Sequence, residues 1–163
     1  MSILSLSLDN KLVIFKLMRF FYIFILFTSF FLITGCSSSY DKLIKNTSKS
    51  PNKFSEYLML AYKDKANFEA KEMHDWNSTK LYSEKALSAI KGKEIYPEKI
   101  NYWKIINTKD KYQLNQAYES LMSVYKEGRN LDPFNLAKAI SSLDCWAEQQ
   151  EENWQTWDIN KCK

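Results

Sequence analysis

Apolar side chains recur every three or four residues over several stretches beyond residue 50, and this spacing is typical of amphipathic helices. The first predicted helix starts at Ser50-Pro51, since a capping residue followed by proline is a common helix start, and runs to about His74. The second begins with Asn77 or Ser78 as its cap and ends at Gly92, where glycine accepts a left-handed backbone. Their apolar faces are formed by Phe54, Tyr57, Leu58, Ala61, Phe68 and Met73, and by Tyr82, Ala86, Ala89 and Ile90.

Two further helices follow residues 93–109, a stretch that is too apolar for a mobile loop. Pro97 and a weak period argue against a continuous helix there, so an ordered connection packed on the core is expected. The third helix begins at Asp110, which resembles the cap of a capping box, and ends at Gly128. The fourth begins at Asp132-Pro133. Their apolar faces are formed by Leu114, Ala117, Tyr118, Leu121, Val124 and Tyr125, and by Leu136, Ala137, Ile140, Leu143 and Ala147.

These elements predict an all-α domain over residues 53–163, built as a small bundle of about four helices in two hairpins. No stretch has a convincing strand pattern, and the whole chain contains three glycines. Each helix has one apolar face that it must bury against its neighbours, and a closed bundle buries all of these faces together.

A different pattern stands at the N-terminus, where residues 20–33 carry no charge. This run is too short for a permanent membrane span, which needs about 20 residues, but it matches the apolar core of a secretory signal. The basic end of such a signal is formed by Lys11, Lys16 and Arg19. The first residue is open, because a start at Met18 instead of Met1 would make a compact signal.

The residues after this run, Ile33-Thr34-Gly35-Cys36, resemble the lipobox of bacterial lipoproteins. The resemblance implies cleavage between Gly35 and Cys36, a diacylglycerol on the Cys36 sulfur, and acylation of the freed amine. Three acyl chains would hold a domain on a membrane almost irreversibly. In such lipoproteins a residue other than aspartate after the cysteine, here Ser37, implies transport to the outer membrane.

Residues 36–52 have the composition of a flexible tether between this anchor and the helical domain. They lack a strong apolar period and are rich in small hydroxylated residues: Ser37, Ser38, Ser39, Thr47, Ser48 and Ser50. We therefore expect a signal peptide over residues 1–35, a lipidated cysteine with a flexible tether over residues 36–52, and a helical periplasmic domain over residues 53–163.

The charge balance argues against nucleic acid as a partner. Residues 36–163 contain 20 basic and 18 acidic residues, a net charge of +2, which is too balanced for that role. Residues 36–111 carry a net charge of +5 and residues 112–163 a net charge of −3. The basic half could rest on anionic lipid or polymer, but lysines on solvated helix faces explain it more simply.

The chain has three cysteines, and this number limits which disulfides it can form. With Cys36 lipidated, Cys145 and Cys162 remain in a compartment that oxidises thiols, which predicts a disulfide between them. A structural zinc ion needs four nitrogen or sulfur ligands, and the chain has a single histidine, His74. No metal and no cofactor is therefore expected, and His74 beside Asp75 is interpreted as a structural residue at a helix end.

A further resemblance rests on Asp144-Cys145-Trp146 followed by Cys162, and on the earlier segment 66–76. Both are similar to the region ahead of the OmpA-like domain in a group of Gram-negative outer-membrane lipoproteins. The resemblance implies a lipoprotein whose helical module lies in the periplasm. In those relatives the OmpA-like domain binds peptidoglycan. No such domain is expected after Lys163, so peptidoglycan binding is assigned to no residue here.

Two functions are consistent with these patterns. The favoured one is a non-enzymatic envelope lipoprotein, with a structural or protein-binding role, whose partners are the lipid bilayer and an envelope protein. The alternative is a glycan-cleaving, cell-wall-active enzyme, because Glu148 and Glu152 near Trp146, Trp154 and Trp157 combine paired carboxylates with aromatic platforms. Four residues apart, Glu148 and Glu152 share one helix face and are expected to be exposed, whereas catalytic carboxylates usually come from facing elements. No catalytic residue is therefore assigned.

Overall fold

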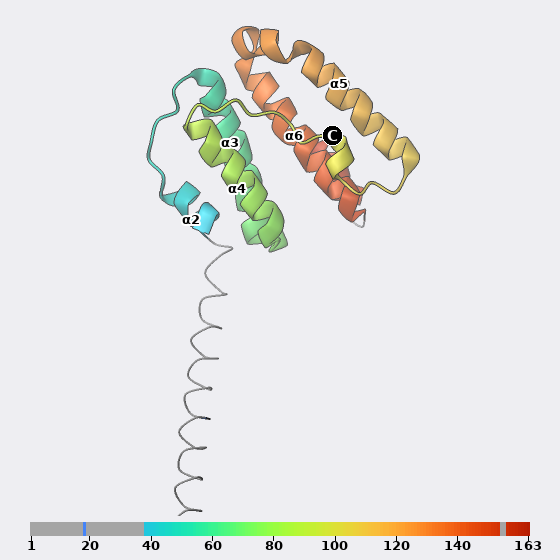
Figure 1. The fold of residues 1–163 in the computed structure, drawn as a ribbon, viewed down its shortest axis with the longest axis horizontal. Coiled ribbons are helices and arrows are strands. Elements are labelled where there is room, and N and C mark those ends of the chain that lie inside the picture. The colour runs from blue at the N-terminus through green and yellow to red at the C-terminus, as the bar shows by residue number, and fades with distance from the viewer. Residues whose placement is uncertain (1–17, 19–37, 154–155) are drawn as a thin grey trace, which may run out of the picture. The chain divides into compact units, whose positions relative to one another are not determined.

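The computed structural model describes residue 18 and residues 38–153 and 156–163. Apart from Met18, the predicted signal peptide lies outside these residues, and so do the lipidation and cleavage residues Cys36 and Gly35. The chain divides into two compact units, Met1–Ser38 and Ser39–Lys163, and nearly all described residues belong to the second. Most of them are helical and none is in a strand, so the prediction of an all-α domain is confirmed (Figure 1).

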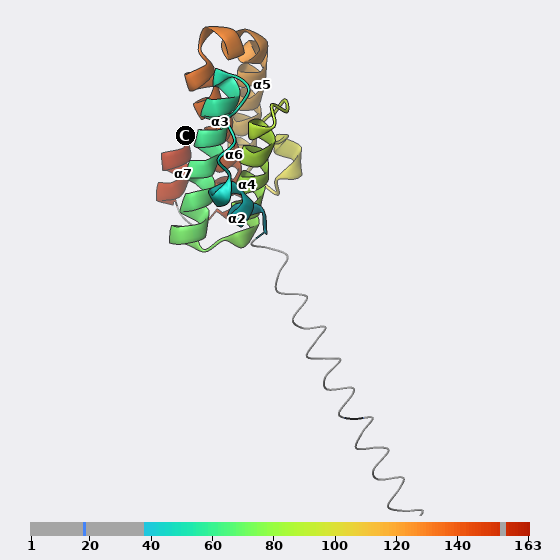
Figure 2. The ribbon, with the colours of Figure 1, turned by 90° about the vertical axis from the view of Figure 1, so that its left-hand side faces the viewer.

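The helices follow one another with short connections. In chain order they are α2 (Ser38–Lys45), α3 (Lys53–Phe68), the π-helical turn η1 (Glu69–Met73), α4 (Trp76–Ile90), the 3₁₀ turn η2 (Ile100–Tyr102), α5 (Thr108–Leu131), α6 (Pro133–Glu152) and α7 (Thr156–Cys162). Helix α6 contacts α3, α5 and α7, and α3 also packs along α4 (Figures 1 and 2). Helix α6 is therefore the element around which the others are arranged.

The caps of α3 and α4 differ from the predicted ones. Asn52, and not Ser50, caps α3, because its side chain accepts from the Ser55 N–H (2.9 Å). Asp75 caps α4 and accepts from the N–H groups of both Asn77 and Ser78, the two residues predicted to be caps. Gly92 follows α4 with a φ of 71°, the left-handed backbone that the sequence predicted.

Helix α5 is longer at both ends than predicted. Asn107 caps it instead of Asp110, and the helix continues past Gly128 to Leu131. Gly128 packs against α6, since a Cβ atom built on it would lie 3.4 Å from Leu136 Cδ2. Gly128 thus lies at the contact between α5 and α6 and does not end the helix. The predicted start of α6 is confirmed, with Asp132 as its cap and proline at the first turn.

The predicted flexible tether is wrong over residues 38–45, which form α2. Leu43 of this helix is 1% exposed and belongs to the main core. The Tyr40 hydroxyl donates to Asn67 (2.8 Å) and the Ser39 hydroxyl to Glu84 (3.2 Å). One buried leucine does not make a detectable apolar period in the sequence. Together with the contacts of Ser39 and Tyr40, it nevertheless holds this helix of eight residues on the domain.

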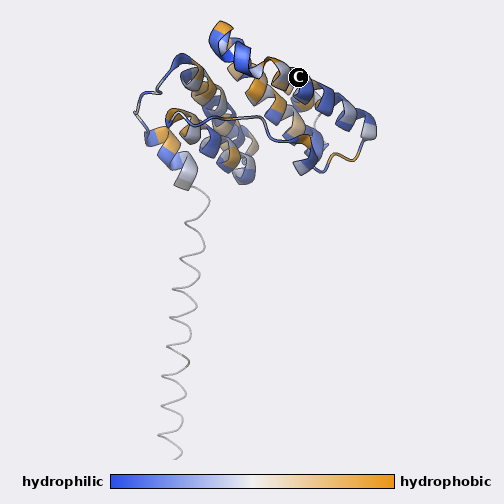
Figure 3. Ribbon diagram, turned by 45° about the horizontal axis from the view of Figure 1, so that its top comes forward, coloured by the Kyte–Doolittle hydropathy of each residue, from blue (hydrophilic) through white to orange (hydrophobic). Residues whose placement is uncertain are grey.

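Two apolar clusters form the interior, and Figure 3 shows the hydrophilic colouring gathered on the outer sides of the helices. The main cluster joins α2, α3, α4, α5 and α6 and is centred on Leu58, Tyr62, Tyr82, Ala86 and Ile140. The second joins residues 93–107 to α5 and α6 through Ile100, Ile105, Leu114, Leu143 and Ala147. The prediction of an ordered connection packed on the core is therefore confirmed.

Candidate functional site

Cys145 and Cys162 lie at disulfide distance, with their Cα atoms 5.5 Å apart. Cys145 belongs to α6 and Cys162 ends α7, so this bond holds α7 against α6. Both side chains are buried, and the Lys65 ammonium of α3 lies 3.0 Å from Cys145 Sγ. The pairing predicted from the sequence is confirmed.

The tryptophans near this bond, considered above as platforms for a sugar, differ in their exposure. Trp157 is 57% exposed, and Trp154 lies outside the described residues. Trp146 is half-buried, and the Lys163 ammonium lies 4.7 Å from its ring centre. An aromatic surface here is thus partly covered by the chain's own lysine.

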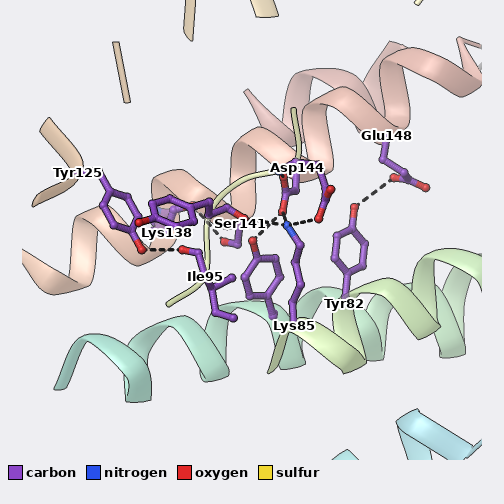
Figure 4. Close-up of polar contacts among 11 residues, drawn as sticks. Tyr82, Lys85, Ile95, Tyr125, Lys138, Ser141, Asp144 and Glu148 are labelled. Atoms are coloured by element: carbon purple, nitrogen blue, oxygen red, sulfur yellow. Dashed lines mark hydrogen bonds and ion pairs between the residues drawn. The ribbon is translucent and has the colours of Figure 1, made fainter. Parts of the chain in front are cut away.

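Asp144, in the middle of α6, is a buried and fully hydrogen-bonded carboxylate, with a side chain that is 1% exposed. Its carboxylate accepts from the Tyr62 hydroxyl (2.6 Å), from the Lys85 ammonium (2.5 Å) and from the Glu98 N–H (2.6 Å). Lys85 also pairs with the Glu98 carboxylate (2.9 Å) and donates to the Tyr96 carbonyl (3.1 Å). In Figure 4 the Lys85 ammonium points directly at Asp144. This network joins α3, α4, α6 and the connection that follows α4.

Burial explains the electrostatics of this network. It raises the pKa of Asp144, while the Lys85 ammonium and the hydroxyl of Tyr62 favour the charged form. Burial and the neighbouring Asp144 raise the pKa of Tyr62 well above its usual value. A charged pair that is this well hydrogen-bonded is costly to break from one side. The network therefore holds α3, α4 and α6 together.

Glu148, one turn further along α6, was expected to be exposed, and this expectation is wrong: it is 4% exposed. It accepts from the Ser78 hydroxyl (2.7 Å) and from the Gln149 amide (2.8 Å), and the Tyr82 hydroxyl lies 3.5 Å away (Figure 4). Burial raises its pKa to about 7. Glu152 is exposed, as expected.

A sequence signal for these buried carboxylates exists. Asp144 and Glu148 follow Ile140 by four and eight residues, so both lie on the apolar face of α6. Lys85 lies between Tyr82 and Ala86 on the apolar face of α4 in the same way. A charged residue at an inward position of a helix period indicates a buried polar contact, but the period does not identify its partner.

Glu69, on η1, is a third buried carboxylate and was not singled out in the sequence. Its side chain is 1% exposed, and its Oε1 atom has no hydrogen-bond partner among the described residues. Burial is the main cause that raises its pKa to about 8, followed by the charges of Glu148, Asp75, Glu152 and Asp158. One end of the molecule thus gathers carboxylates from η1, α4, α6 and α7.

His74 ends η1 with a φ of 57°, the left-handed backbone, and its side chain is exposed. Its N–H donates to the carbonyl of Glu69. The residue therefore turns the chain from η1 towards Asp75.

Charged side chains line several cavities of the described residues. One of about 550 Å³ is lined by Lys53, Lys126 and Arg129 over the rings of Phe54 and Tyr57. Arg129 already pairs with Glu94 (2.8 Å). A smaller cavity of about 270 Å³ lies beside the disulfide, and the buried carboxylates Glu69 and Asp158 line it.

Comparisons with known proteins found no matching family model, no similar curated protein and no similar solved structure. Within the part of the chain that the structure describes, no helix is both long and apolar enough to cross a membrane.

Proposed function

We propose that this protein is a lipid-anchored lipoprotein of the outer membrane, whose helical domain has a structural or protein-binding role in the periplasm. The observation that carries the proposal is the pairing of Cys145 with Cys162. Disulfides persist in oxidising compartments such as the periplasm. The pairing also leaves Cys36 as the one remaining cysteine of the chain, at the end of the lipobox-like Ile33-Thr34-Gly35-Cys36.

The polar interior supports a role without catalysis. Asp144 and Glu148 are buried and hydrogen-bonded to side chains of α3, α4 and α6, so their carboxylates serve the fold. Four main helices, α3 to α6, arranged as two hairpins around these contacts, would form a rigid module. Such a module suits a scaffold or a protein-binding part that acyl chains hold at the membrane.

The anchor is tested by replacing its cysteine in the full-length protein, expressed in a Gram-negative host with radiolabelled palmitate. Cys36→Ser should abolish the label and leave an uncleaved precursor, since the thiol receives the diacylglycerol before cleavage. The double variant Cys145→Ser/Cys162→Ser is the matched control and should be labelled and cleaved like the wild type. A Cys36→Ser protein that is still labelled and cleaved would refute the lipoprotein proposal.

The alternative, a glycan-cleaving enzyme, is favoured by one observation: Glu148 and Glu152 bring carboxylate oxygens within 4.8 Å of one another, and retaining glycosidases use a close pair of carboxyl groups. The pKa of Glu148, raised to about 7, would suit a general acid. Both groups nevertheless lie on one helix, and Glu148 is already engaged by Ser78 and Gln149.

A peptidoglycan zymogram of the purified full-length protein separates the two functions. We expect no cleared zone from the wild type, and none from the variants Glu148→Gln and Glu152→Gln. A cleared zone that disappears in either variant would support the enzyme and contradict the proposed role.

A further inference from the structure

A groove runs along one face of α3, beside the first turns of α6 and the last turns of α5. The starts of α3 and α6 and the end of α5 lie at the same end of the domain (Figures 1 and 2). Two cavities form the groove, one of about 550 Å³ and one of about 300 Å³, and Tyr57 lines both of them. Steps of three and four residues place Lys53, Tyr57, Leu60 and Asp64, which line the cavities, on one face of α3. This face, which we call the α3–α6 groove, is about 16 Å long at 1.5 Å per residue.

The α3–α6 groove is basic. Lys53, Lys126 and Arg129 line the larger cavity, and none of the described residues that line it is acidic. Arg129 pairs with Glu94 (2.8 Å), but Glu94 does not line this cavity. The charged residues that line the smaller cavity are three lysines and one aspartate: Lys65, Lys138, Lys161 and Asp64. A partner that complements the charge of the groove is therefore negative.

Apolar side chains lie between these cations and remain open to solvent. Phe134 of α6 is 55% exposed and Leu60 of α3 is 50% exposed. The Phe134 ring packs edge-on against Tyr57, with 5.4 Å between the ring centroids, so two rings meet beside both cavities. The Arg129 guanidinium lies 5.3 Å from the centroid of the Phe54 ring, which lines the larger cavity. Aromatic residues and arginine are enriched at protein interfaces relative to the rest of the surface. Exposed rings among cations thus suit a protein partner.

We propose that the α3–α6 groove binds an extended acidic segment of an envelope protein, with aromatic or aliphatic side chains between its carboxylates. The carboxylates pair with the exposed Lys53, Lys126 and Lys138, and the apolar side chains cover Phe134 and Leu60. A groove of about 16 Å takes about five residues of an extended chain. This inference rests on the proposed protein-binding role and names the kind of partner.

An anionic membrane surface fits the groove less well. Helix α2 begins two residues after Cys36, and the hydroxyl of its Tyr40 donates to Asn67 near the end of α3. Asn67 lies about 20 Å from Lys53 along the axis of α3. The larger cavity is therefore at the end of α3 away from the contact with α2. A groove between helices also admits a single chain more readily than a flat lipid surface.

Fluorescence anisotropy tests the groove in the full-length protein, purified in a nonionic detergent. The probe is a fluorescein-labelled peptide of about eight residues in which glutamate and phenylalanine alternate, so that an extended chain has carboxylates on one side and rings on the other. We expect saturable binding that weakens as NaCl is added, because salt screens exposed ion pairs. Two reference peptides, with lysine for glutamate or glycine for phenylalanine, should each bind about tenfold more weakly or less.

Charge variants locate the binding site. Lys53→Gln/Lys126→Gln should weaken binding of the probe about three- to thirtyfold, as expected for the loss of two exposed ion pairs. Lys109→Gln/Lys111→Gln is the matched control, because it removes the same charge from exposed positions at the other end of α5. All four lysines are exposed, so both variants should fold, and circular dichroism checks this.

The apolar part of the groove is tested in the same way. Phe134→Ala should weaken binding of the probe about fivefold or more, the loss typical of an aromatic anchor at an interface. Tyr112 of α5, which is 64% exposed, gives the control, and Tyr112→Ala should bind the probe like the wild type.

Equal binding by the two double lysine variants would overturn the proposed site, and so would the absence of saturable binding to the wild type. Sedimentation of the same proteins with phosphatidylglycerol vesicles and with peptidoglycan sacculi measures the competing occupants. If either one binds through Lys53 and Lys126 while the peptide does not bind, the groove takes lipid or glycan and the proposal is wrong.

The palmitate labelling at Cys36 is an independent result. A labelled protein that does not bind the peptide retains the proposed anchor and refutes the proposed partner. A protein that binds the peptide without being labelled retains the partner and refutes the anchor.

Discussion

Several charged residues of this protein are buried, although charged side chains ordinarily stay in water. Asp144, Glu148 and Glu69 are the clearest examples. The buried Asp144 carboxylate is compensated by three donors, one of them the Lys85 ammonium, and Glu148 by two side-chain donors at close distance. Glu69 has the least compensation, because one of its oxygens is unpartnered. The three residues thus form a series in which the cost of burial is offset less and less completely.

This series predicts how stability depends on pH. The pKa of Glu69 is about 8 in the folded protein against an ordinary value of 4.5, so between these values the folded state binds more protons than the unfolded state. Stability contributed by this group is therefore present below pH 4.5 and is lost as the pH rises towards 8. Glu148 adds a similar loss between pH 4.5 and about 7.

Glu69→Gln should remove this loss, because glutamine imitates the protonated form. The variant should gain stability relative to the wild type as the pH rises from 5 to 8, by at most about 5 kcal/mol, since the pKa shift from 4.5 to about 8 is about 3.5 units of about 1.4 kcal/mol each. Urea unfolding at pH 5 and pH 8 measures the effect, with Glu119→Gln, at an exposed position of α5, as control. A variant that gains no stability relative to the wild type between pH 5 and pH 8 would contradict the series.

At the level of the helices, capping residues and tertiary contacts determine where each helix begins and ends more than the apolar period does. Asp75 and Asn107 cap their helices two to three residues before the predicted caps, whereas Asn52 caps α3 two residues after the predicted Ser50. Gly128 lies inside α5, where its backbone is helical, and contacts Leu136 of α6. Helix α2 is held to the domain by Leu43 and Tyr40, which pack on the core, and by hydrogen bonds of Ser39 and Tyr40.

The role of α2 is tested by two neighbouring substitutions. Leu43→Ala should lower the free energy of unfolding by about 2–4 kcal/mol, the usual cost of emptying a buried leucine site. Ile44 is 44% exposed, and Ile44→Ala should change the stability by no more than about 0.5 kcal/mol. Urea denaturation of the full-length protein in detergent measures both. Equal, small effects would restore the flexible tether over residues 38–45.

At the scale of the whole molecule, contacts distant in sequence close the domain. Tyr62 and Asp144 are 82 residues apart and join α3 to α6, and Cys145 and Cys162 attach the C-terminal α7 to the same helix. Helix α7 has seven residues, too few for a stable isolated helix. Its order therefore depends on the disulfide and on the burial of Ile159.

Removal of the disulfide should loosen this end of the molecule. Cys145→Ser/Cys162→Ser should lower the stability by roughly 3 kcal/mol in the chain-entropy model. It should also remove hydrogen-exchange protection from α7 while α3 and α4 remain protected. Mass spectrometry of the unreduced, unfolded wild type checks the bond directly, because two free thiols would both be alkylated. Unchanged protection of α7 in the double variant would show that packing alone holds it.

The sequence by itself determined the helical class, the start of α6 at Asp132-Pro133, the turn at Gly92 and the Cys145–Cys162 pairing. These features depend on periodicity, on local backbone chemistry or on the small number of cysteines. Each of these can be recognised from a short stretch of sequence or by counting residues. The anchor at Cys36 and the role in the envelope stay predictions, to be decided by the labelling experiment.

Only the tertiary structure decided which charged residues are buried and what they contact. The period of α6 places Asp144 and Glu148 on its apolar face, but their donors come from α3, α4 and the connection, 46 to 82 residues earlier. Whether a carboxylate at an inward position is exposed, neutralised or left without a partner depends on those distant groups. Burial multiplies the strength of each such contact and the cost of each missing one, because water no longer screens it.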